Sequence, residues 1–437
     1  LLSAPRASLA GPLQLSDAFF ALAAGCWVVS VVSERSWGSF PRALRPALLA
    51  LLGYGAWAAC SGLWSPTPRT WLFHTAALGY IGAIWLLTQA LLSADARLRR
   101  WVADAWIIAF GISAVLGVAA VISFYAGFRD PAHNGLIANY GSMTPGNYPR
   151  VRILGTNPSF CGSYLLTAGC VAFALRRSAT DLLRRALPWL TLAGAVSLFF
   201  TFTAAVGAVG VAAAVWGLYA HRELGRKAGK YFVVIGGAAA LGMLLLSVLR
   251  FAPPGRGDIP IGPVDIQLGA SVRISIWGKA LDTFRAHPIT GAGLGSPAAW
   301  VTDPRAYTPG EKWREEMASM VLPPVPMEAH NTYLSVLAQL GLVGFALFSL
   351  FVALNLVALV RSQRAAPERW GALATLLAAL GYHGIFASLE ENRHIWFSLG
   401  LAAAVATLGL STPPPSQGDK EASPRDAEAR TPPRTGA

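Results

Sequence analysis

Residues 101–127 read WVADAWIIAFGISAVLGVAAVISFYAG, an apolar run whose one carboxylate is Asp104. A helix needs about 20 mostly apolar residues to cross the hydrocarbon core of a bilayer, so this run predicts a transmembrane helix. The whole chain shares this character, since 54% of its 437 residues are hydrophobic and 13% are charged. Soluble proteins carry roughly 25% charged residues, and half that share cannot cover a water-facing surface. The composition therefore indicates a membrane-embedded bundle.

Working outward from this run, we predict further spans on both sides. The stretch 186–220 is apolar throughout and too long for one crossing, so we divide it near 203–204. The fold class is an all-α polytopic membrane protein of 11–12 transmembrane helices, twelve if a further span precedes residue 1. The predicted spans are 17–33, 44–62, 71–93, 101–127, 160–175, 186–203, 204–220, 231–250, 330–360, 370–388 and 394–411.

Clusters of arginine and lysine predict the orientation, because cytoplasmic loops of membrane proteins are enriched in both. The clusters follow alternate predicted spans, so all of them fall on one side if 186–220 is divided. This bias explains the net charge of +13 without nucleic acid, for which no basic stripe interleaved with aromatic residues is present. The residues are Arg35, Arg42, Arg45, Arg97, Arg99, Arg100, Arg176, Arg177, Arg184, Arg185, Arg222, Arg226, Lys227, Lys230, Arg361, Arg364 and Arg369.

This topology divides the chain into four segments. Residues 1–250 hold the N-terminal spans and a first outer loop, 128–159. Residues 251–329 form a larger outer loop, and 330–411 hold the C-terminal spans. Residues 412–437 are rich in proline and mixed charges, a composition that predicts a disordered cytoplasmic tail.

A histidine stands where the larger outer loop meets the next span. His330-Asn331 is followed by nine residues and then by Gly341 and Gly344. An imidazole can accept a proton from a hydroxyl near neutral pH, which suits a general base, and the glycines would let a neighbouring helix approach closely. The alternative is an interfacial histidine at a helix start, with glycines that serve only packing.

Charged and apolar residues alternate at helical spacing over 270–286, which predicts an amphipathic helix on the outer membrane surface. It contains Arg273 and Lys279 and ends before Pro288. A guanidinium can hold a phosphate through two hydrogen bonds. Alternatively, Arg273 extends its guanidinium from the interface into water.

A third outer stretch, just before the span at 160–175, contains Arg150 and Arg152. Two arginines on the outer side run against the charge bias, so we expect a negative partner, either a pyrophosphate or a loop carboxylate such as Asp130. Arg393 and His394 belong to a charged run between the last two spans, which either shapes the site or is a solvated turn.

Other patterns exclude several chemistries. The glycines at 291, 293 and 295 lack the strand–helix context and spacing of a nucleotide fingerprint. The outer carboxylates form no compact cluster with metal-ligand spacing, so we expect no metal and no cofactor. The four cysteines show no CxxC pair, and we interpret them as packing residues.

Taken in order, these motifs resemble the O-antigen ligases and the related O-antigen polymerases and protein O-oligosaccharyltransferases. The first match is the pattern His-[Asn/Ser/Gln]-x9-Gly-x-x-Gly at 330–344. The chain departs from many relatives at Thr203-Ala-Ala-Val-Gly207, where they carry an arginine. The other matching residues are Arg152, Gly155, Asn157 and Pro158, and then Arg273, Trp277, Pro288, Gly291 and Gly293.

The resemblance implies a GT-C-like bundle in the Gram-negative inner membrane with its active site facing the periplasm. It implies metal-independent, inverting transfer of a glycan en bloc from undecaprenyl pyrophosphate to a hydroxyl of the lipid A-core oligosaccharide. His330 would activate that hydroxyl, and Arg152 and Arg273 would hold the pyrophosphate. The expected further substrate contacts are Arg150, Asn331, Lys279, Arg393 and His394.

Three alternatives stay open. An O-antigen polymerase would also use two outer loops, and a protein O-oligosaccharyltransferase would differ in its acceptor. A secondary transporter would place ionisable residues near the middle of the membrane, for which Asp104 and His383 are the candidates.

Overall fold

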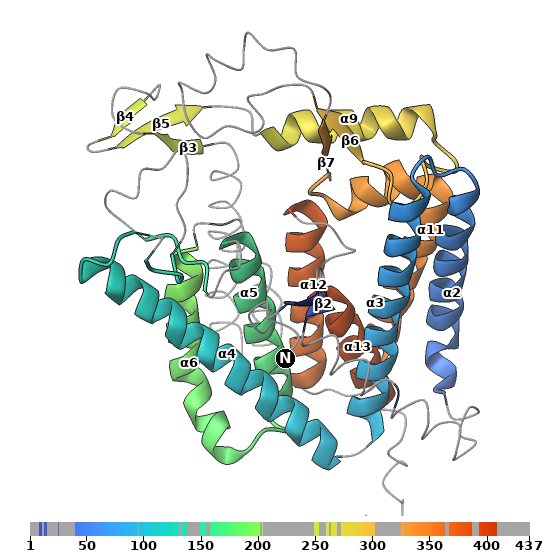
Figure 1. Ribbon diagram of the computed structural model, residues 1–437. Coiled ribbons are helices and arrows are strands. Elements are labelled where there is room, and N and C mark those ends of the chain that lie inside the picture. The colour runs from blue at the N-terminus through green and yellow to red at the C-terminus, as the bar shows by residue number, and fades with distance from the viewer. Residues whose placement is uncertain are drawn as a thin grey trace, which may run out of the picture.

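The structure is a computed structural model in which antiparallel helices form a bundle with one further helix across its end (Figure 1). It describes residues 8–10, 13–14, 25, 40–94, 96–130, 133–137, 149–153, 158–201, 203, 249–252, 259–261, 264–268, 272–301, 325–327, 329–362, 367–386 and 393–408. The predicted spans at 17–33, 204–220 and 231–250 lie almost entirely outside these residues.

The described helices follow the predicted spans closely. The predicted amphipathic helix is α9 (Val272–Ala286), which lies across one end of the bundle (Figure 1). We call this end the outer end, after its predicted orientation. The bundle helices are α2 (Arg45–Cys60), α3 (Pro68–Ala94), α4 (Ala96–Tyr125), α5 (Pro158–Leu175), α6 (Asp181–Phe199), α11 (Thr332–Arg361), α12 (Pro367–Phe386) and α13 (Arg393–Leu408), with short 3-10 turns η2 (Arg42–Leu44) and η3 (Ser61–Leu63) beside α2.

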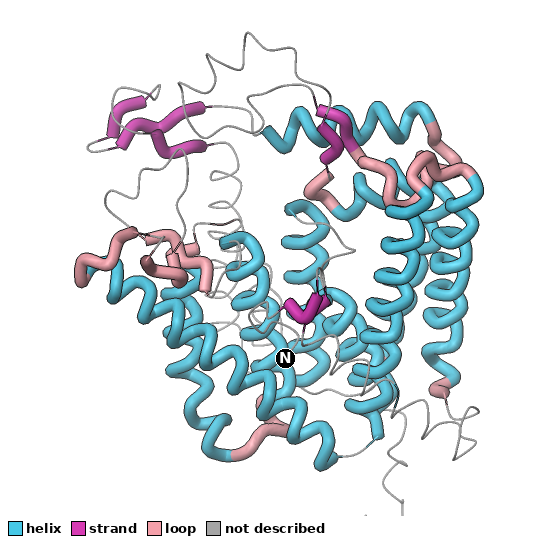
Figure 2. The backbone as a smooth tube through the Cα atoms, viewed as in Figure 1, coloured by secondary structure: helices cyan, strands magenta, loops and turns pink. Residues whose placement is uncertain are grey.

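Short antiparallel strands accompany the helices (Figure 2). β6 (Ala299–Val301) pairs with β7 (Val325–Met327), which returns the chain to the bundle just before α11. β1 (Ser8–Ala10) pairs with β2 (Leu13–Gln14), and β5 (Val264–Leu268) lies between β3 (Leu249–Ala252) and β4 (Ile259–Ile261).

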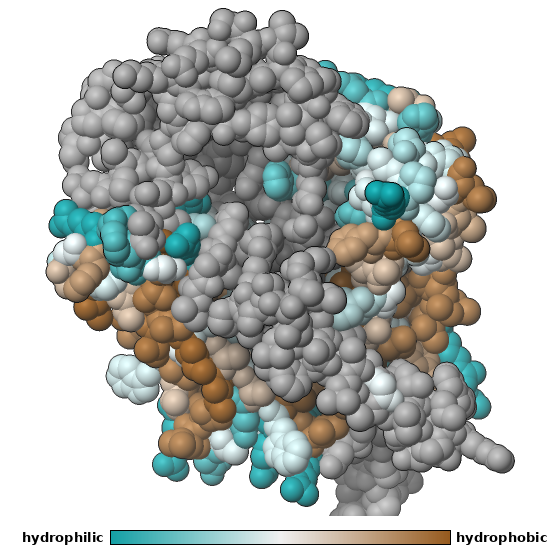
Figure 3. All heavy atoms as spheres, in the orientation of Figure 1, coloured by the Kyte–Doolittle hydropathy of each residue, from teal (hydrophilic) through white to brown (hydrophobic). Residues whose placement is uncertain are grey.

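Within the described residues, five helical segments are long and apolar enough to cross a membrane: Arg42–Leu63, Pro68–Ser93, Ala96–Tyr125, Asp181–Phe199 and Thr332–Arg361. Large apolar side chains stay exposed on the outside of the bundle, including Ile108, Ile112, Trp189 and Leu192. On the coloured part of the face in Figure 3, hydrophobic residues lie between hydrophilic ends. The all-α polytopic membrane class is therefore confirmed.

Glycines bring the paired helices into close contact. α4 packs against α6, α3 against α13, α5 against α12 and α2 against α11. A Cβ at Gly371 of α12 would lie 2.6 Å from the Ala174 Cα of α5, and one at Gly400 of α13 would lie 2.7 Å from the Thr88 Cβ of α3. Small residues stabilise helix pairs in lipid because the hydrophobic effect does not drive helices together there.

Buried polar contacts join the helices. The Trp85 indole N–H donates to Asn355 Oδ1 at 3.0 Å, and both side chains are fully buried. Asp104 Oδ1 accepts a hydrogen bond from the backbone N–H of Thr180 at 2.9 Å. Thr180 is the N-cap of α6, so Asp104 accepts a hydrogen bond from one of the free N–H groups at the start of this helix. A carboxylate there also interacts favourably with the helix dipole.

The helix ends divide into two sets. Arg45, Arg97 and Arg361 lie at the ends of α2, α4 and α11 that point away from α9. The α2–α3 connection, the segment after α4 and the start of α11 lie at the end that α9 covers (Figure 1). α6 ends at Phe199, close to the predicted division of the 186–220 stretch.

Cysteine labelling tests this orientation in a background whose four native cysteines are replaced by alanine. His133 and Arg177 are both exposed, at opposite ends of the bundle. A membrane-impermeant maleimide should label His133→Cys in cells with a permeable outer membrane, and should label Arg177→Cys only after the inner membrane is opened. The reverse pattern would invert the topology.

Candidate active site

The start of α11 holds His330 in an unusual backbone conformation. His330 is half-buried and has φ 46°, in the left-handed region. Asn331, the N-cap, accepts a hydrogen bond at its Oδ1 from the Leu334 N–H at 3.1 Å. This cap satisfies one of the free N–H groups at the helix start. The Asn331 side chain is therefore buried in a structural contact, and its contact with substrate stays a prediction.

Backbone strain is found at two of the predicted motifs. His330 and Ile153 (φ 43°), which follows Arg152, are the non-glycine residues with positive φ in the described part of the chain. The left-handed conformation costs an L-residue roughly 1–2 kcal/mol, and it is most unusual for a β-branched side chain. Such strain persists only where the surroundings impose it, and it clusters at functional sites.

A hydrogen bond joins α9 to the residue before His330. The Trp277 indole N–H donates to the Ala329 carbonyl oxygen at 3.1 Å. Small buried side chains line the adjoining region and let α9 and α11 approach closely. They are Ala280, Ala298, Ala329 and Ala338, with Leu334 beside them.

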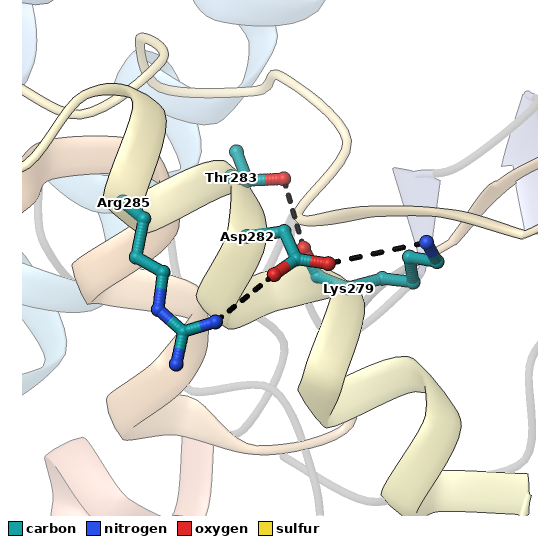
Figure 4. A network of polar contacts seen from close by, with 4 residues as sticks. All are labelled: Lys279, Asp282, Thr283 and Arg285. Carbon is teal, nitrogen blue, oxygen red and sulfur yellow. Dashed lines mark hydrogen bonds and ion pairs between the residues drawn. The ribbon is translucent and has the colours of Figure 1, made fainter.

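The exposed side of α9 carries the charged residues shown in Figure 4. Asp282 lies between Lys279, whose Nζ is 3.9 Å from Oδ2, and Arg285, whose guanidinium donates to Oδ1 at 3.1 Å. All three side chains are more than half exposed, so these pairs add little stability. Lys279 is thus available at the surface while paired weakly with Asp282, and its contact with substrate stays a prediction.

The structure corrects the predicted role of Gly341 and Gly344. Gly341 breaks α11, with φ 65° and ψ −165°, a conformation that essentially only glycine adopts. A Cβ there would overlap the Ile289 carbonyl group. A Cβ at Gly344 would meet Leu340 of the same element. Gly341 therefore admits a bend and the close approach of a loop, whereas the sequence pattern predicted the approach of a neighbouring helix.

The loop Pro288–Ser296, which we call the glycine loop, satisfies the backbone groups that the bend frees. The Leu342 N–H donates to the Pro288 oxygen at 2.9 Å. The Ala338 and Gln339 oxygens accept, each at 2.9 Å, from the N–H groups of Ala292 and Gly293. A Cβ at Gly291 would overlap the Gln339 carbonyl group, so the loop packs against the bend of α11 only with glycine at this position.

Two side chains, one from α2 and one from α11, add hydrogen bonds around this bend. The Trp57 indole N–H of α2 donates to the Leu340 oxygen at 3.0 Å. The Gln339 side chain accepts from the Gly295 N–H at 2.8 Å and donates to Ser335 Oγ at 2.8 Å. Gln339 is buried, and both the oxygen and the nitrogen of its amide are hydrogen-bonded within this contact region.

The α2–α3 connection holds the other side of the glycine loop. Ser61 Oγ accepts from the Leu294 N–H at 3.0 Å. Thr67 Oγ1 donates to the Gly295 oxygen at 3.3 Å. No local sequence pattern marks these residues or Gln339, because their partners lie far away along the chain.

The arginines at 149–153 lie in another part of the outer end, over α4 and α6, while α9 lies over α11 (Figure 1). Arg150 Nε donates to the Thr201 oxygen and Arg152 Nε to the Gly135 oxygen, both at 3.1 Å. Asp130, the predicted alternative partner, forms a pair with His133 at 2.7 Å. The contacts of Arg150 and Arg152 thus fix their segment to its neighbours.

For four predicted residues the structure describes the backbone alone. Arg273 lies in the first turn of α9, and Arg393 and His394 begin α13. His383 lies near the end of α12. Their roles stay predictions, while the contact between α9 and the residue before His330 places Arg273 on the element that adjoins the histidine.

These features define a polytopic helical membrane protein with a strained histidine at the outer rim of its bundle. Residues 165–349 match the family model described as O-antigen ligase, which confirms the resemblance to that superfamily. The match covers less than half of the chain, from α5 to α11, and includes Arg273, His330 and Gly341. It indicates transfer of lipid-linked sugars. No curated protein matches the chain.

Substitution of Gly341 tests the bend. Gly341→Ala should destabilise the protein by more than the roughly 1–2 kcal/mol of a left-handed residue, because the new Cβ also displaces the Ile289 carbonyl. Thermal unfolding in detergent measures the loss. Gly79→Ala in α3 is the matched control, since nothing lies within 4 Å of its Cβ position and alanine stabilises a helix interior by roughly 0.5–1 kcal/mol. Equal unfolding temperatures for the two variants would contradict the bend.

Proposed function

We propose that this protein is an O-antigen ligase, acting at the periplasmic face of the Gram-negative inner membrane. It transfers a glycan en bloc from undecaprenyl pyrophosphate to a hydroxyl of the lipid A-core oligosaccharide. The observation that carries the proposal is His330, strained and half-buried at the outer rim of the bundle, within the segment that matches the family. Donor and acceptor are both anchored in lipid, so their reactive groups meet at this depth.

The reaction uses His330 as the general base. Its imidazole takes the proton of the acceptor hydroxyl while the hydroxyl oxygen attacks the anomeric carbon of the donor glycan. The bond from that carbon to the pyrophosphate oxygen breaks, and the pyrophosphate leaves with the bonding electrons. Attack opposite the leaving group inverts the anomeric centre. The donor is already activated, so the step requires neither nucleotide nor cofactor.

The arginines stabilise the leaving group. Negative charge grows on the pyrophosphate as the bond breaks, and fixed cations at that place lower the barrier. Arg273 on α9 and Arg152 hold the pyrophosphate in this proposal, with Arg150 as a further contact. Asn331, Lys279, Arg393 and His394 are the proposed contacts with the rest of the substrates.

An O-antigen polymerase is the second candidate, because the match is to a superfamily that includes both activities. The two long outer segments, 128–159 and 251–329, suit either activity. The acceptor distinguishes them, since the polymerase extends a lipid-linked glycan and the ligase consumes one. A protein acceptor is the remaining possibility within the superfamily.

Replacement of His330 tests the base. We expect His330→Asn and His330→Ala each to lower ligation by roughly 10²–10⁴-fold, the usual contribution of general base catalysis. Asn adopts the left-handed conformation readily, so His330→Asn keeps the fold. The assay contains purified protein, a polyprenyl-pyrophosphate glycan and lipid A-core, with no metal or nucleotide added. Ligation at the wild-type rate in a folded His330→Asn variant would refute the assignment.

The products of the same assay decide between the activities. Glycan-bearing lipid A establishes the ligase. A lengthened polyprenyl-linked glycan with unchanged lipid A establishes the polymerase. If folded protein acts on neither, a protein acceptor or transport becomes the better explanation.

The proposed roles of Arg152 and Arg273 are tested by comparison with Arg129, another arginine at the same end of the bundle. Arg152→Ala and Arg273→Ala should each lower transfer by roughly 10²–10³-fold, the effect of removing one donor to a developing anion. Arg129→Ala is the control, since Arg129 is exposed at the same end of the bundle and lies over the Phe124 ring. An equal loss in all three variants would indicate a general effect of outer positive charge.

A further inference from the structure

We propose that Trp277 is a positioning residue that fixes the backbone of His330. The inference deepens the proposed function, since it rests on His330 as the base. The observation is the hydrogen bond of 3.1 Å from the Trp277 indole N–H to the Ala329 carbonyl oxygen. That oxygen belongs to the same planar peptide group as the nitrogen of His330, so the bond anchors the peptide plane on one side of the histidine Cα.

The helix cap holds the residue that follows the histidine. The Asn331 backbone oxygen accepts from the Ser335 N–H at 2.8 Å, and its Oδ1 accepts from the Leu334 N–H at 3.1 Å. A planar peptide group leaves two soft dihedral angles at each residue. With the Ala329 carbonyl held by the indole on one side and Asn331 held in the helix cap on the other, the φ and ψ angles of His330 are restricted, which supports the left-handed conformation.

The indole bond offsets the cost of the left-handed conformation. The left-handed conformation of an L-residue and the net contribution of one hydrogen bond have similar magnitudes and opposite signs. Removal of the indole N–H therefore allows His330 to relax towards an ordinary conformation. It also leaves the Ala329 oxygen, on a fully buried residue, without that donor.

The same bond fixes how α9, which carries Arg273, lies against the segment that contains His330. Position 273 precedes Trp277 by one helical turn, so both positions lie on one face of α9. The contacts around the bond are with small side chains, namely those of Ala280, Ala298 and Ala338. Such a surface packs closely but does not define an angle, whereas a directional hydrogen bond does.

The test is Trp277→Phe, which keeps an aromatic ring and removes the N–H. In the full-length protein we expect kcat to fall about tenfold or more, the scale on which one misplaced contact acts, while KM for the donor changes by less than about twofold. Backbone amide exchange at the start of α11, over 332–335, should become faster. In the His330→Asn background, Trp277→Phe should lower transfer no further, because the two residues act as a unit.

Trp71→Phe is the matched control. The Trp71 indole N–H donates to the Ala58 oxygen at 3.1 Å, so the variant loses a bond of the same kind and length at the same end of the bundle. It should change neither kcat nor exchange at 332–335. A general loss of stability would affect both variants, and a loss of positioning would affect only Trp277→Phe.

The outcomes separate this inference from the proposed function. Unchanged exchange at 332–335 in Trp277→Phe overturns the inference, whatever the activity. A higher donor KM with unchanged kcat also overturns it, since Trp277 would then bind substrate. If the wild-type protein transfers no glycan, the proposed function fails, and faster exchange in Trp277→Phe alone still supports the role of Trp277 in holding His330.

Discussion

The bend of α11 at Gly341 is the constraint on which the outer end of this protein depends. A bend within or beside a membrane frees backbone groups, and each unsatisfied group there costs several kcal/mol. The glycine loop and Trp57 supply partners for the groups around Gly341. The helix can bend only if the glycine loop packs against it, and the bend sets the direction of the segment that begins at His330. The geometry of the candidate site therefore follows from the need to satisfy these backbone groups.

The bundle below supplies the rigidity that this arrangement requires. Helices pack in pairs through glycine contacts, and the buried pair of Trp85 and Asn355 links α3 with α11 in the interior. The α2–α3 connection then reaches the glycine loop through Ser61 and Thr67. The strained histidine is thus supported by elements from both halves of the chain, which suits catalytic positioning because strain persists only when the surroundings impose it.

The charge distribution fits chemistry on lipid-borne substrates better than transport. Asp104, the first candidate for an ion pathway, caps α6 near the end of the bundle that faces away from α9. The proposed catalytic arginines belong to segments at the end of the bundle that is predicted to face the periplasm, where the bias towards positive charge on the cytoplasmic side would otherwise deplete them. Cations retained on that side suit an anionic donor such as a pyrophosphate.

Hydropathy and short motifs are local properties of a sequence, and they predicted the membrane class, the bounds of the described helices to within a few residues, the helix α9 and the superfamily. They also singled out His330, whose role as a base stays a prediction. The folded structure adds that Gly341 bends α11, that the Asn331 side chain caps it, and that Trp277 contacts Ala329. Those features depend on partners far apart along the chain, such as Trp57 and Leu340, 283 residues apart, and no local pattern encodes which distant backbone groups will meet.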